Sequence, residues 1–119
     1  MRVTGIDHVQ VAAPAGCEEQ ARGFYGALLG LEELPKPEAL RARGGCWFRA
    51  GGQELHVGVE SNFAPARKAH PGFVVDDLDA LRRRLQTAGL QPRDDDAIPA
   101  TERFYAEDPF GNRLEFRQA

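Results

Sequence analysis

A pattern repeated in the two halves of this sequence limits its fold more than any other feature. Gly30-Leu31 recurs 59 positions later as Gly89-Leu90, and Gly52-x-x-Leu55 recurs at the same offset as Gly111-x-x-Leu114. An offset that persists across several structural elements is typical of two similar modules. At 119 residues the chain is long enough for one domain with a real hydrophobic core.

Hydrophobic periodicity predicts the elements of the first half. β-Branched residues predict a strand over 5–12, and alternation places His8 and Gln10 on one of its faces. Apolar residues then recur at helical spacing between Ala21 and Leu29, and Gly30 can end this helix. Three short strands follow over 31–34, 45–49 and 54–60, with a Gly-Gly turn joining the last two.

The second half repeats this order. A strand over 72–75 precedes Asp76 and Asp77, either of which can cap a helix that extends to Gly89. Further strands are expected over 90–93, 102–106 and 113–117, with a type I turn at Asp108-Pro109-Phe110-Gly111. The prediction is an α+β fold of two β-α-β-β-β modules, about 1–60 and 69–119. The segment 61–68 between them is a linker or a gate that overhangs a functional site.

Composition narrows the function classes. The chain has 15 Lys and Arg against 18 Asp and Glu, and its basic residues are scattered apart from Arg82-Arg83-Arg84, which argues against nucleic acid as partner. No apolar run is long enough for a membrane span, and no signal peptide is evident, so a cytoplasmic protein is expected. Cys17 and Cys46 form no C-x-x-C motif and are expected to be buried or incidental thiols.

All three histidines of the chain fall at positions related by the repeat. His8 corresponds to His70, and His56 corresponds to Glu115 at the offset of 59. Taken alone, a strand histidine is more often structural, and a glutamate near the end of a chain is usually solvated. Taken together, imidazole and carboxylate at paired strand positions predict a site for a divalent metal ion such as Zn, Fe, Mn, Ni or Co.

Three segments carry a resemblance to a known family. Asp7-His8-Val9-Gln10-Val11, the run from Phe24-Tyr25 to Gly30-Leu31, and the tail from Asp108 to Phe116 resemble the vicinal oxygen chelate superfamily. That group includes glyoxalase I, fosfomycin-resistance glutathione transferases, methylmalonyl-CoA epimerase, extradiol dioxygenases and bleomycin-resistance proteins. The resemblance covers nearly the whole chain, and the tail is its most specific part.

The resemblance implies a cupped mixed sheet and a metal held by His8, His56, His70 and Glu115. It also implies a homodimer whose paired modules build two equivalent sites. The substrate would be a small molecule with adjacent oxygens, and the reaction would be of isomerase, lyase, dioxygenase or transferase type. The alternative is a metal-free protein that binds a drug or metabolite, as in the bleomycin-resistance branch.

The sequence also departs from the family pattern. Glyoxalase I has a carboxylate that serves as base at the position of His56, and fosfomycin-type enzymes use only three protein ligands. His56 and His70 therefore compete for the third ligand position, Glu54 is a stand-in ligand or base, and Glu115 is a second catalytic candidate. Substrate contacts are expected from Arg49, Arg103 and Tyr105, whereas three other aromatic residues are expected in the core: Trp47, Phe48 and Phe104.

Overall fold

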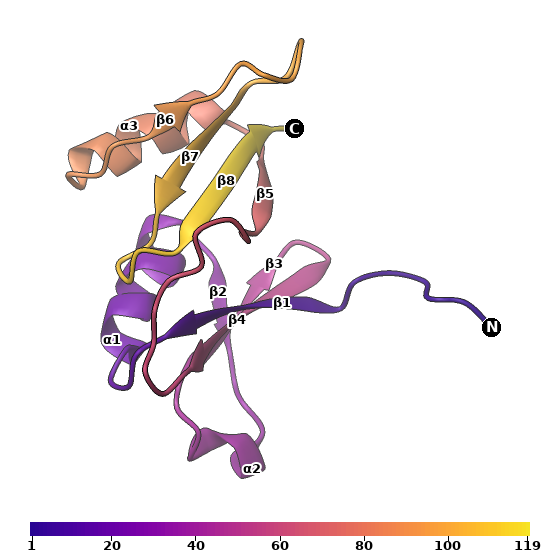
Figure 1. Cartoon of the computed structure of the whole chain (residues 1–119), viewed down its shortest axis with the longest axis vertical. Coiled ribbons are helices and arrows are strands. Elements are labelled where there is room, and N and C mark those ends of the chain that lie inside the picture. The colour runs from indigo at the N-terminus through magenta and orange to yellow at the C-terminus, as the bar shows by residue number, and fades with distance from the viewer. The chain divides into compact units, whose positions relative to one another are not determined.

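Two four-stranded mixed sheets of identical topology make up the computed structural model, which describes residues 1–119 (Figure 1). The chain divides into two compact units, Met1–Ala64 and Pro65–Ala119, called module one and module two below. In both sheets the strand order, counted along the chain within each module, is first, fourth, third and second. The first and fourth strands of each module pair in parallel, and the other neighbouring strands are antiparallel. This shared topology confirms the predicted repeat.

Module one contains four strands in the predicted places: β1 (His8–Ala13), β2 (Glu32–Leu34), β3 (Cys46–Ala50) and β4 (Gln53–Val59). Gly51-Gly52 joins β3 to β4, because Ala50 pairs with Gln53 across the turn. The sequence did not predict the single-turn helix α2 (Glu38–Arg41). Its short length leaves no apolar periodicity to detect.

The expected helix of module one is only partly α-helical. An α-helical turn, α1 (Glu18–Ala21), runs into a π-helical segment, η1 (Arg22–Leu28). The N–H of Leu29 donates to the carbonyl of Phe24, five residues back, at 2.9 Å. Apolar spacing alone cannot separate this bonding pattern from the α-helical one, so the predicted helix is present but only its first turn is α-helical. Phe24 and Tyr25 are still buried as that spacing predicted.

A close approach of two strands fixes the start of β3. Gly45 has φ +87°, and a Cβ there would lie 2.0 Å from the carbonyl oxygen of Val57 on β4. Its N–H donates to the Glu18 carboxylate at 2.9 Å. This hydrogen bond and a second one from the Cys17 thiol hold the pKa of Glu18 below its usual value. Only glycine fits this position. Its hydrogen bond to Glu18 also joins the sheet of module one to the helix.

Module two comprises β5 (Gly72–Val75), α3 (Leu78–Thr87), β6 (Arg93–Asp94), β7 (Arg103–Glu107) and β8 (Arg113–Gln118). Asp77 caps α3, because its carboxylate accepts the N–H of Ala80 at 2.9 Å. Apolar residues from α3, β7 and β8 are fully or nearly buried and form the core of this module: Leu78, Leu81, Leu85, Phe104, Leu114 and Phe116.

The strand expected over 90–93 is the least accurate prediction. Strand β6 has only two residues and starts at Arg93, where it pairs with Tyr105. Residues 90–92 follow the left-handed Gly89 and lie outside any strand. No helix in either module is long and apolar enough to cross a membrane.

Candidate functional site

The sheet register gives the four candidate ligands equivalent places in the two modules. Gln10 on β1 pairs with His56 on β4, and Gly72 on β5 pairs with Glu115 on β8. His8 stands two residues before Gln10, and His70 stands two residues before Gly72. Alternation then puts His8 on the face of His56, and His70 on the face of Glu115. The correspondence inferred from sequence offsets is therefore also a correspondence of register.

In module one, three aromatic rings from three neighbouring strands stack on one another. The His56 ring lies 4.0 Å from the Trp47 ring, at 3° between their planes, and 4.2 Å from the His8 ring, at 15°. His56 is buried, whereas the His8 side chain is 46% exposed. Trp47 is only partly buried, so the expectation that it packs in the core was wrong. It pairs with His56 in the register and must share its face.

Glu54 and Arg49 lie on the same face of module one. Glu54 Oε1 lies 2.9 Å from His56 Nε2, so the stand-in ligand suggested by the sequence is the direct partner of a candidate ligand. Arg49 is opposite Glu54 in the register. Its guanidinium instead forms an ion pair with Glu32 at 3.5 Å, and its side chain is 55% exposed. Arg49 is thus on the expected face but at its solvated edge.

In module two, His70 faces hydrogen-bond acceptors with both ring nitrogens. Nδ1 lies 2.8 Å from the carbonyl oxygen of Lys68, and Nε2 lies 3.1 Å from Glu115 Oε1. Since a carbonyl can only accept, Nδ1 carries a proton in this contact. Nε2 then faces a carboxylate, an arrangement that a proton or a cation satisfies. A histidine that donates one ring N–H to a carbonyl is typical of metal ligands, because the contact fixes the ring and its tautomer.

Arg103 and Tyr105 surround Glu115 on the same face. Arg103 Nη1 donates to the Tyr105 hydroxyl at 2.7 Å and lies 3.2 Å from Glu115 Oε1. Its Nη2 binds Asp95 at 2.9 Å. The hydrogen bond to Tyr105 and the charges of Asp95 and Glu115 raise the pKa of Arg103. Arg103 and Tyr105, the substrate-contact candidates of module two, therefore both lie beside Glu115. In this structure Arg103 is the ionic partner of Glu115.

Two residues of this cluster, Asp95 and Arg113, were not predicted from the sequence. Asp95 belongs to an acidic run, Asp94 to Asp96, which reads as a solvated segment, and nothing in the sequence indicates its contact with Arg103. Arg113 has its guanidinium carbon 4.1 Å from the centre of the Tyr105 ring. Here a signal did exist, because Arg113 is two residues before Glu115 and so shares its face of β8.

The tail motif shapes the turn that leads into β8. Asp108 is buried, and its carboxylate accepts the backbone N–H groups of Phe110 and Asn112 and the Asn112 side-chain amide, each at 2.9 Å. The N–H of Gly111 donates to the carbonyl of Asp108, which confirms the predicted turn. The motif therefore sets where β8 begins and, with it, the position of Glu115.

The donor types suit a divalent metal, although they occur as pairs. Imidazole nitrogen and carboxylate oxygen are ligands for zinc and other first-row divalent ions. No three His, Cys, Asp or Glu side chains gather so as to hold a metal ion. Each module instead supplies one pair: the His8 ring stacks on the His56 ring, and His70 Nε2 faces Glu115 Oε1.

Solved structures resemble the chain over almost its full length. A glyoxalase family protein from Bacillus anthracis is 57% identical, with a TM-score of 0.95, over 99% of this chain and 97% of that one. A lactoylglutathione lyase from Agrobacterium tumefaciens is 21% identical, with a TM-score of 0.76, over 100% of this chain and 96% of that one. A glyoxalase/dioxygenase from Nostoc punctiforme is 21% identical, with a TM-score of 0.77, over 96% of this chain and 90% of that one.

At 21% identity, the last two structures share the fold alone. No curated protein matches the sequence. A family model matches residues 5–116, a range that covers most of each module and contains all four candidate ligands. The chain belongs to the Glyoxalase/Bleomycin resistance protein/Dioxygenase superfamily.

Proposed function

We propose that this protein is a metal-dependent enzyme that acts on a small substrate with adjacent oxygen atoms. The observation that supports it best is the His70 and Glu115 pair, in which Nδ1 is bound to the Lys68 carbonyl and Nε2 faces a carboxylate. The equivalent register of His8 and His56 in module one adds a second pair of donors. All four residues are proposed as ligands of a divalent ion, Zn, Fe, Mn, Ni or Co.

The metal would supply a Lewis acid that polarises the oxygens of the substrate. The residues of the chain then have separate roles. Glu54, hydrogen-bonded to His56 Nε2, and Glu115, bound to His70 and Arg103, are the candidates for holding or moving a proton. Arg103, Tyr105 and Arg49 would orient oxygen atoms of the substrate. Isomerase, lyase, dioxygenase and transferase reactions are all compatible with this set.

Elemental analysis of untagged, gel-filtered protein tests the proposal. The wild type is expected to carry stoichiometric divalent metal, and His8→Ala or Glu115→Ala to abolish it. His56→Ala and His70→Ala, prepared alongside, decide which histidine is the third ligand. Glu60→Gln, an exposed carboxylate change at the end of β4, is the matched control and should keep the metal. Retained metal in both His8→Ala and Glu115→Ala would refute the ligand assignment.

The identity of the metal selects the next assay. Iron would direct the search to catechol-like substrates and to oxygen uptake. Zinc, nickel or manganese would direct it to epimerase, lyase and glyoxalase-type reactions. Loss of turnover in Glu54→Gln with metal retained would mark Glu54 as the proton-transfer group, whereas loss of metal would mark it as a ligand.

One observation favours the alternative, a metal-free binding protein. The Nε2 atom of His56 lies 2.9 Å from Glu54 Oε1 within module one, so this candidate ligand is satisfied without an ion. Protein that stays metal-free after reconstitution, yet is stabilised against heat by a drug or metabolite, would establish this second function.

We further propose a homodimer, as the family resemblance implies. Light scattering coupled to size-exclusion chromatography tests it. A mass of one chain at all concentrations would contradict it.

A further inference from the structure

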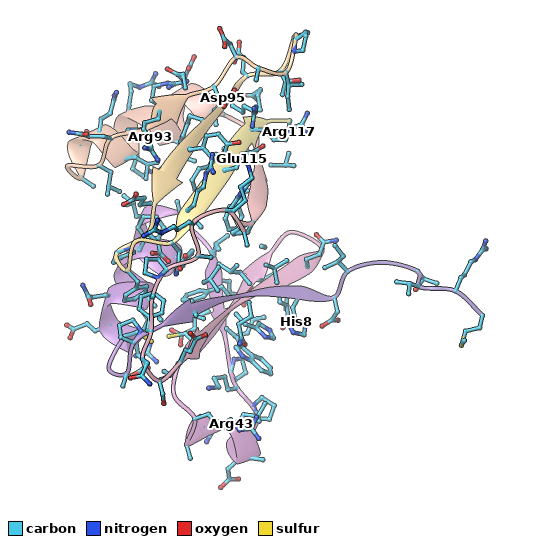
Figure 2. The ribbon with its side chains drawn as sticks, viewed as in Figure 1. His8, Arg43, Arg93, Asp95, Glu115 and Arg117 are labelled. Atoms are coloured by element: carbon cyan, nitrogen blue, oxygen red, sulfur yellow. The ribbon has the colours of Figure 1, made fainter.

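Arginines gather on the face of the module two sheet that carries Glu115. In the register, Arg93 on β6 lies opposite Tyr105 on β7, and Tyr105 lies opposite Glu115 on β8. Residues two positions from these share their face, which adds three more arginines: Arg103, Arg113 and Arg117. Figure 2 labels Arg93, Glu115 and Arg117 on these strands.

The opposite face of the sheet is apolar and covered. Phe104, Leu114 and Phe116 alternate with the arginine face and are buried. Leu78, Leu81 and Leu85 of α3 are buried as well. The hydrophobic core of this module therefore lies on the opposite side of the sheet, and the arginine face is its polar surface.

Arg103 has both terminal nitrogens bound by neighbours of its own chain, although its Nε, like that of Arg113, is buried without a partner. Its two terminal nitrogens contact Tyr105, Glu115 and Asp95. It is buried at 8% exposure, so it neutralises and positions Glu115. It has little capacity left for a ligand.

Arg113 differs from Arg103 because its guanidinium has no acceptor in the chain. It forms no ion pair, although Glu107 lies opposite it in the register, and its Nε is buried without a hydrogen-bond partner. Its one defined contact is the ring of Tyr105, 4.1 Å from the guanidinium carbon. A guanidinium held against a ring is oriented in advance, and its terminal nitrogens have no acceptor in the chain that a ligand would have to displace.

Two more arginines raise the positive potential around this group. Arg93 and Arg117 are exposed and have no carboxylate within ion-pair distance. The four arginines outnumber the three carboxylates of this face, Asp95, Glu107 and Glu115, and such an excess of positive charge attracts anions and raises their local concentration.

We propose that Arg113, oriented by Tyr105 and flanked by the charges of Arg93 and Arg117, binds an oxyanion of the substrate. The substrate is then a small molecule with a carboxylate or phosphate group in addition to the oxygens that face the metal. The inference rests on the proposed function only for assigning this face to the substrate. Planar bidentate pairing with a guanidinium suits both anions.

The test is a nuclear magnetic resonance titration that follows the arginine Nε–Hε signals at constant ionic strength. The probes are sodium acetate, sodium phosphate and neutral acetamide, with a chelator present so that no anion binds through a metal. The Arg113 signal, identified by its loss in Arg113→Gln, is expected to shift saturably with one or both anions and not with acetamide. The tighter-binding anion names the substrate group.

Variants separate a site from general charge attraction. Arg113→Gln is expected to weaken binding of the preferred anion at least about tenfold, the effect of losing one charge-assisted contact. Arg113→Lys keeps the charge but loses the planar guanidinium, so its affinity for the anion should lie between those of the wild type and Arg113→Gln. Arg83→Gln, an equal charge change at an exposed position of α3, should bind as the wild type does. The amide spectrum confirms that each variant is folded.

The outcomes also separate this inference from the proposed function. Unsaturable shifts, or equal affinity in wild type and Arg113→Gln, would overturn the oxyanion site even if the protein binds metal. Loss of anion binding in Arg113→Gln, in a protein that proves metal-free, would keep the oxyanion site and reject the metalloenzyme.

Discussion

The two modules share one strand order but differ in what surrounds their paired side chains. In module one, His56 lies between two aromatic rings, those of Trp47 and His8. In module two, Glu115 lies in an ionic network with His70 and Arg103. The topology therefore fixes the position of each pair of candidate ligands, and the side chains of the neighbouring strand determine its chemical surroundings.

The same contrast extends to the start of the third strand of each module. Gly45 stands two residues before Trp47, as Arg103 stands two residues before Tyr105. Module one uses this place for a backbone approach that excludes any side chain. Module two fills it with the guanidinium that binds Glu115 and Asp95. One position thus serves packing in one repeat and electrostatics in the other.

The largest effect on stability is expected when Gly45 is given a side chain, which removes this difference between the modules. Gly45→Ala should destabilise the protein by about 3 kcal/mol, because it adds a Cβ 2.0 Å from a carbonyl oxygen at a left-handed φ. Urea denaturation followed by circular dichroism measures the change. Gly52→Ala is the matched control, since a Cβ there meets nothing within 4 Å. Equal stability of the two variants would mean that β3 and β4 do not approach as described.

The repeat made most of the fold predictable. A pattern that occurs twice constrains every strand twice, and β5 was placed at its observed bounds, Gly72–Val75. The candidate ligands also followed from offsets, because the parallel strand pairs keep the same register in both modules. The π-helical segment Arg22–Leu28 did not follow, since buried side chains repeat similarly in both helix types.

The surroundings of the site were less predictable. Two steps from the sequence would have placed two more residues: the two-residue turn at Gly51-Gly52 sets Trp47 opposite His56, and alternation along β8 puts Arg113 on the face of Glu115. The contact between Asp95 and Arg103 depends on the path of the chain after β6. A polar residue in an acidic run gives no signal of that path, so only the structure reveals it.

The second effect uses a difference in composition between the modules. Both cysteines lie in module one, and both are buried. Burial, with a hydrogen bond to Glu18, raises the pKa of Cys17 to about 12, and burial raises that of Cys46. A disulfide reagent at pH 8 should therefore react only as fast as module one opens. Immediate reaction of the native protein would show that the thiols are accessible.

The pH dependence of these thiols has a definite sign. A raised pKa means that the folded state keeps the thiol protonated while the unfolded state ionises above about 9. The stabilisation is complete below pH 9 and is lost between pH 9 and about 12. Denaturation at pH 8 and pH 10 should show lower stability at pH 10, and Cys17→Ala should reduce that difference.

A smaller effect tests the helix of module two. Asp77→Ala should cost about 1 kcal/mol, because the carboxylate accepts the N–H of Ala80 at the start of α3. Cys17, the N-cap residue of α1 in module one, makes no such side-chain bond. Asp76→Ala, one residue earlier and exposed, should change stability by less than about 0.5 kcal/mol in urea denaturation. An equal loss in both variants would assign the effect to charge alone.

The smallest expected effect is spectroscopic and separates the two pairs of candidate ligands. Trp47 is the one tryptophan of the chain, and one face of its ring is covered by His56. His56→Ala uncovers that face to water, so the emission maximum should move to longer wavelength. His70→Ala should leave the emission unchanged, because His70 contacts Tyr105 and Glu115 in module two. A change of tryptophan emission on adding zinc to the wild type, absent in His56→Ala, would then indicate that the ion reaches the module one pair. A metal that binds stoichiometrically without any change in emission would argue for His70 as the third ligand.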